Sequence, residues 1–132
     1  MKEHITTCSI QLEMSGANFN SEFMALFLER FFLIIALKMN SSNADLIGHI
    51  KGFCTGCKND YLKVSLIPGN KNVDIAGVWA HESDTAVLTL NIIVLGLIQH
   101  DPREIILEAM RKMKHLCIIT TKPQMDQAFK NR

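Results

Sequence analysis

The chain has 132 residues, 48% of them hydrophobic and 20% charged, and its formal net charge is +1. A chain of this length and composition can bury a core and is too apolar to stay disordered. The near-zero net charge gives no electrostatic reason to expect nucleic acid or an anionic membrane as a partner. We therefore expect one globular domain over residues 1–132.

The N-terminal segment MKEHITTCSIQLEM indicates a strand and gives no sign of a secretory signal, because it lacks an apolar core and a small-residue cleavage site. Cys8, Ile10 and Leu12 alternate with polar residues, which is the period of a strand with one buried face. We expect a cytoplasmic protein whose four cysteines are reduced thiols.

Residues 21–39 form the first predicted helix, with a cap at Asn20 or Ser21. Its two apolar blocks are separated only by Glu29 and Arg30, and they are too short to cross a membrane. An apolar surface wider than one stripe predicts cover on more than one side. That cover is either another subunit or the chain's own sheet and loops.

Strand patterns follow at residues 45–53, 61–67, 73–80 and 85–97. The short polar connections between them favour hairpins and therefore a mostly antiparallel sheet. In the last of these patterns, Leu88, Leu90, Ile92 and Val94 form one wholly apolar face, so we expect it to lie centrally in the sheet.

A second helix is predicted over residues 100–116, with Asp101 as its N-cap and Pro102 at its first position. Residues 117–121 can add a short edge strand, and residues 121–132 form a short helix or a frayed tail. The excess of basic residues over 103–132 fits either a solvated helix face and tail or contact with an acidic partner.

The order of elements is therefore β-α-β-β-β-β-α. It predicts an α+β fold in which a mostly antiparallel sheet of four to six strands carries two main helices on one face.

The segment GHIKGFCTGCKND raises the question of a metal site, because Cys54 and Cys57 form a C-x-x-C pair near a predicted hairpin tip. Two thiolates at this spacing can bind one Zn²⁺, but a closed structural site needs four ligands. The two missing ligands would have to come from distant residues or from the same loop of a second subunit. Zinc is therefore one hypothesis, and two reduced thiols beside a turn are the other.

The sheet face turned away from the helices is a second candidate. Lys51, Lys63, Ser65 and Asn91, with His49 and Thr89, are predicted to share this face and to suit a small anionic ligand. The alternatives are a solvated face or a contact between two sheets. Ile47, Phe53, Ile93 and Leu95 on the same face favour the contact.

The segment HESD, residues 81–84, is a third candidate, because His81 and two carboxylates lie within four residues. Loop tips also collect polar residues without any chemical role. The motifs of nucleotide hydrolysis and of the common hydrolases are absent from the sequence.

These patterns predict a small homo-oligomeric binding or interaction protein. The alternative is an enzyme that acts on a small anionic substrate at a subunit boundary, with His49 or His81 as acid or base and Lys51 or Lys63 holding the substrate. A zinc-stabilised module through the C-x-x-C pair is the third hypothesis.

Overall fold

The helix α1 (Ser21–Ser42) begins at one of the two caps that the sequence indicates. The computed structural model describes residues 5–42, 47–67, 72–95 and 101–122. In it the side-chain oxygen of Asn20 accepts a hydrogen bond from the backbone N–H of Phe23 at 2.8 Å. An Asn cap satisfies an N–H group that has no partner inside the helix. The start of α1 is therefore set by local chemistry.

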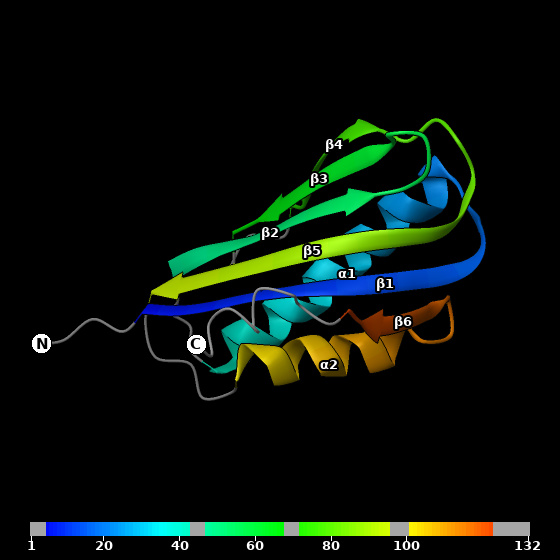
Figure 1. Cartoon of the computed structure of the whole chain (residues 1–132). Helices are drawn as coiled ribbons and strands as arrows, with labels where there is room; N and C mark the ends of the chain where they lie inside the picture. Colours follow the sequence, from blue (N-terminus) through cyan, green and yellow to red (C-terminus); the bar gives the residue numbers. More distant parts are fainter. Residues whose placement is uncertain (1–4, 43–46, 68–71, 96–100, 123–132) are drawn as a thin grey trace, which may run out of the picture.

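Within the described ranges, six strands form one sheet in the order β4-β3-β2-β5-β1-β6, and every neighbouring pair is antiparallel (Figure 1). The strand β5 lies between β1 and β2, so its predicted central position is confirmed. The strands are β1 (Ile5–Phe19), β2 (Ile47–Thr55), β3 (Tyr61–Leu66), β4 (Asp74–Val78), β5 (Ser83–Leu95) and β6 (Ile118–Thr121).

One face of the sheet, the inner face, carries the core. The alternation predicted for the fifth strand is confirmed, because Leu88, Leu90, Ile92 and Val94 are all fully buried. Neighbouring strands add apolar side chains in register, such as Ile10 opposite Leu90 and Ile50 opposite Ile92. The inner face is therefore continuous across β1, β5 and β2.

Both helices pack against the inner face (Figure 1), which buries most of the apolar surface of α1. Phe27, Phe31 and Phe32 are almost completely inaccessible, and the rings of Phe27 and Phe31 stack with centroids 5.7 Å apart. The helix α2 (Pro102–Met113) lies beside α1, and Lys38 forms an ion pair with Glu108 at 3.8 Å. The sheet and α2 therefore supply the cover on more than one side that α1 was predicted to need.

The helix α2 has the predicted N-terminus. The carboxylate of Asp101 accepts a hydrogen bond from the N–H of Arg103 at 2.9 Å, and Pro102 occupies the first turn. After α2, the edge strand β6 pairs with β1 and completes the sheet. The predicted C-terminal helix or tail lies, from residue 123 onward, outside the described residues.

The predicted α+β class, with an antiparallel sheet and two helices, is confirmed, and β6 is an addition to the basic order. The largest difference is in β1, which continues to Phe19 through residues that have turn composition. The reason is tertiary, because β5 supplies pairing partners as far as Ser83, with an irregular register between Ser15 and Phe19. No helix in the described part of the chain is long and apolar enough to span a membrane.

Candidate functional site

The face of the sheet opposite the helices, here called the outer sheet face, is covered by neither α1 nor α2 (Figure 1). Its side chains come from alternate positions of the strands, because successive residues of a strand point to opposite faces. It is lined by Ser9, Gln11, Glu13, His49, Lys51, Phe53, Tyr61, Lys63, Ser65, Asp74, Val78, Val87, Thr89, Asn91 and Ile93.

The four predicted ligand-binding residues all lie on this face. Lys51 is paired with Asn91 on β5 and with Ser65 on β3, so these three side chains are direct neighbours. Side chains that lie directly opposite one another across the strands form a row. Lys63 is in the row next to that of Lys51, opposite Phe53. Directly opposite residues have Cβ atoms about 5 Å apart, so one small ligand could contact several of them. The row that contains Lys51 ends in the carboxylate of Asp74, which disfavours an anion at that edge.

The outer sheet face is partly apolar along its central strands. Phe53 on β2 is 42% exposed and Ile93 on β5 is 50% exposed. The ring of Phe53 stacks on that of Tyr61, with centroids 5.8 Å apart and an interplanar angle of 24°. Phe53 and Ile93 lie on the two central strands, Phe53 near the middle of the face and Ile93 near the end of β5, with the row of Lys51 and Asn91 between them. Gln11 and Thr89 join neighbouring strands beside Phe53 through a side-chain hydrogen bond of 3.1 Å.

The two predicted catalytic histidines lie at opposite ends of the sheet. His49 is on the outer sheet face, opposite Ile93. His81 is in the loop between β4 and β5, beside the turn that follows Thr55 at the far end of β2. Six residues of strand separate His49 from Thr55, which is about 20 Å. The two imidazoles therefore cannot act on one substrate within one chain.

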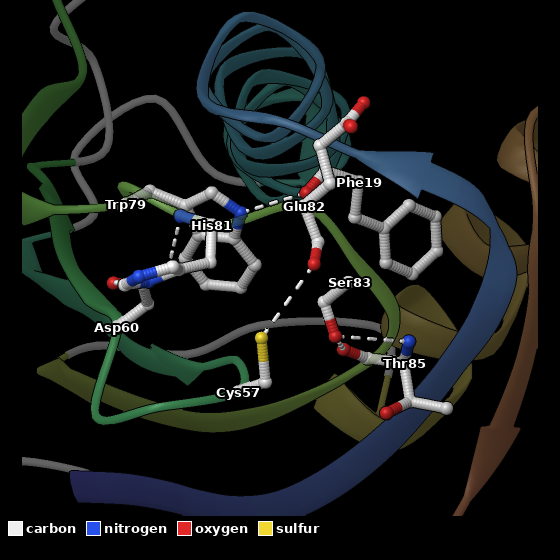
Figure 2. A network of polar contacts seen from close by, with 8 residues as sticks. All are labelled: Phe19, Cys57, Asp60, Trp79, His81, Glu82, Ser83 and Thr85. Carbon is white, nitrogen blue, oxygen red and sulfur yellow. Dashed lines mark hydrogen bonds and ion pairs between the residues drawn. The ribbon is translucent and has the colours of Figure 1, made fainter.

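The turn between β2 and β3 and the loop between β4 and β5 form a polar cluster at one end of the sheet (Figure 2). Lys58 and Asn59 have φ angles of 53° and 67°, and the N–H of Asp60 donates to the carbonyl of Cys57 at 3.0 Å. Two central residues with positive φ define the type I′ turn that suits a two-residue hairpin. This turn directs the side chain of Asp60 toward the neighbouring loop.

Asp60 is the buried charged group of this cluster, with only 4% of the residue exposed. One carboxylate oxygen accepts the backbone N–H of His81 at 2.7 Å and lies 3.3 Å from Nδ1 of the same residue (Figure 2). Burial by itself raises the pKa of this carboxyl. The backbone hydrogen bonds from His81 and Ala80, with the imidazole contact, outweigh burial, so the pKa of Asp60 is lowered.

Trp79 closes the same end of the core. Its indole N–H donates to the carbonyl of Phe19 at 2.8 Å, and the residue is buried (Figure 2). A Cβ on Gly56 would lie 2.6 Å from the Trp79 ring, so the turn needs glycine there for space. Trp79 therefore has a packing role. The contacts between Asp60 and His81 hold the β2–β3 turn against the β4–β5 loop.

The two cysteines of the C-x-x-C pair have different surroundings. Cys54 is fully buried in the core, where burial raises the pKa of its thiol to about 12. Cys57 is half-buried in the turn, and its thiol donates to the carbonyl of Glu82 at 3.6 Å. All four cysteines are free. No group of three or more His, Cys, Asp or Glu side chains that could hold a metal forms among the described residues, so the zinc hypothesis gains no support.

A separate depression of about 360 Å³ lies between the two helices, lined by Lys38, Glu104, Ile105, Leu107, Glu108 and Arg111. Its walls are mostly charged side chains, including the ion pair between Lys38 and Glu108. None of the predicted site residues contributes to it.

Sequence reasoning missed Asp60, whose importance comes from its contact with a loop twenty-one positions away. The neighbouring Lys58-Asn59 pair has turn composition, and it alone could have indicated that Asp60 leaves a tight turn. The structure also places Tyr61 beside Phe53, a contact that the separate strand patterns do not reveal.

Comparison of the chain with protein-family models, with curated proteins and with solved structures found no match.

Proposed function

We propose that this protein is a small homo-oligomeric interaction module and that the outer sheet face is its contact surface. The observation that carries the proposal is that the central strands bear the exposed apolar side chains Phe53 and Ile93 on the face that neither α1 nor α2 covers. The side chains near them are polar, with Lys51 and Asn91 in the row that separates Phe53 from Ile93, and Gln11 in the row of Phe53. Exposed apolar side chains among polar ones are typical of protein contact surfaces.

The dimensions of the face support the same function. Six strands about 4.8 Å apart span about 29 Å, and the nine residues of β2 span about 30 Å. The flat area is therefore roughly 850 Å², compared with about 800 Å² per partner in a standard protein interface.

The two alternative functions have less support. An enzyme needs acid, base and anion-binding groups that converge in a pocket, whereas His49 and Lys51 lie on an open sheet face and His81 lies at the far end of the sheet from them. A small anionic ligand would find Lys51, Ser65 and Asn91 together, but on an open face that ends in Asp74. Ligand sites are usually concave, so the open shape favours a protein partner.

Native mass spectrometry and light scattering of protein purified without chelator test the proposal. We expect a species of at least twice the chain mass of 14.9 kDa at concentrations between about 1 and 100 µM. The same spectrum weighs any bound zinc or anion. A monomer throughout this range would refute the proposed function.

A further inference from the structure

The charged side chains of the outer sheet face are distributed unevenly about its midline, which runs between β2 and β5. Lys51 and Lys63 lie on β2 and β3, on one side. Glu13 lies on β1, on the other side, where β5 and β1 contribute no lysine or arginine to this face. Of the four inner strands, β2 and β3 therefore form a basic half and β5 and β1 an acidic half, whereas the edges carry the opposite charges, Asp74 on β4 and Lys122 after β6.

We propose that a second copy of this chain docks on the outer sheet face about a two-fold axis that runs along the midline, roughly parallel to the strands. This inference rests on the proposed function and specifies the partner and its orientation. The rotation places β3 over β1 of the second copy and β2 over β5, because these strands are equally distant from the midline. The lysine-bearing half then faces the half that carries Glu13.

The register supports a specific ion pair between Lys63 and Glu13 of the second copy. Lys63 lies in the row of Phe53, Thr89 and Gln11, and Glu13 is two residues further along β1. That offset is about 7 Å along the strand, which a lysine and a glutamate side chain can bridge. The two-fold axis forms the pair twice.

An independent pair of charges at the edges shows the same offset. Asp74 lies on β4, in the row of Lys51. Lys122 lies at the opposite edge of the sheet. Its N–H donates to the carbonyl of Gln11 at 2.8 Å, which places it in the row of Gln11, next to the row of Asp74. Within the described part of the chain, none of the side chains of Glu13, Lys63, Asp74 and Lys122 forms an ion pair.

Both pairs are displaced by one row in the same direction, so one tilt of the two sheets improves both contacts. The same axis runs beside Phe53 and Ile93, because they lie on the two central strands. A two-fold axis perpendicular to the strands would instead lay the lysines on β2 and β3 against their own copies.

Charge reversal tests the orientation. Lys63→Glu makes both positions of the proposed pair acidic, and Glu13→Lys makes both basic. We expect each variant alone to dimerise about tenfold or more weakly at low ionic strength. An equimolar mixture should form mainly heterodimers, and the double variant should recover the wild-type dissociation constant. Lys58→Glu, in the β2–β3 turn, is the matched control and should change little.

Native mass spectrometry with one variant ¹⁵N-labelled counts homodimers and heterodimers, and circular dichroism verifies that each variant is folded. A wild-type dimer with no preference for heterodimers in the mixture, or with no recovery in the double variant, overturns this orientation and leaves the proposed function intact. A wild-type monomer refutes both.

Discussion

Truncation of Phe53 gives the sharpest test of the outer sheet face, because this side chain is apolar, exposed and central. A phenylalanine buries about 200 Å² at most, so the 42% exposure of Phe53 leaves about 85 Å² for a partner to cover. At about 25 cal/mol per Å², covering it contributes about 2 kcal/mol per copy and about 4 kcal/mol per dimer. Phe53→Ser should therefore raise the dimer dissociation constant by up to about a thousandfold.

Sedimentation equilibrium of the wild type and the variant measures the two dissociation constants. Leu37→Ser is the matched control, because Leu37 is 68% exposed but lies on α1, away from the outer sheet face. We expect the control to dimerise like the wild type. Equal dissociation constants for Phe53→Ser and the wild type, with both proteins folded, would show that this face is not the contact surface.

Three further predictions concern the stability of the fold. Because the pKa of Asp60 is lowered from its ordinary value of 3.8, its contribution to the free energy of unfolding is complete above that value and is lost as pH falls through the folded-state pKa. Asp60→Asn should therefore have a lower free energy of unfolding than the wild type at neutral pH and should lose less of it in acid. Parallel pH profiles of the two proteins in chemical denaturation would contradict this. A Cβ at position 52 would lie 2.6 Å from the ring of Phe32, so Gly52→Ala should lower the free energy of unfolding by about 1–3 kcal/mol, and an unchanged urea midpoint would show that the ring can move. Cys54→Ser places a hydroxyl in the core and should lower the melting temperature with or without chelator, whereas Cys57→Ser should have little effect. If both variants lost the same amount of melting temperature, and chelator lowered the wild type equally, a metal site would be indicated instead.

Local patterns in the sequence were sufficient for the elements and their buried faces. The alternation of Leu88, Leu90, Ile92 and Val94 identified the inner face of β5, because the side-chain period of a strand depends only on neighbouring residues. Asn20 and Asp101 marked the starts of the helices, because a cap bonds N–H groups two or three positions away. The same alternation placed the predicted ligand-binding residues on one face.

Contacts between distant segments required the tertiary structure. The surplus of apolar residues on α1 fitted either another subunit or the chain's own elements, and only the position of α2 beside α1 decided between them. The separation of His49 from His81 follows from which end of β2 meets the β4–β5 loop. A pattern along one strand carries no information about which strands lie beside it.

The sequence by itself therefore determined the α+β class, the central position of β5 and the composition of the outer sheet face, because each depends on local period or on the order of elements. Only the tertiary structure decided that Asp60 reaches His81, and that Lys63 and Glu13 lie equally far from the midline of the sheet. The physical reason is that strand order and register come from pairing between segments far apart in the chain.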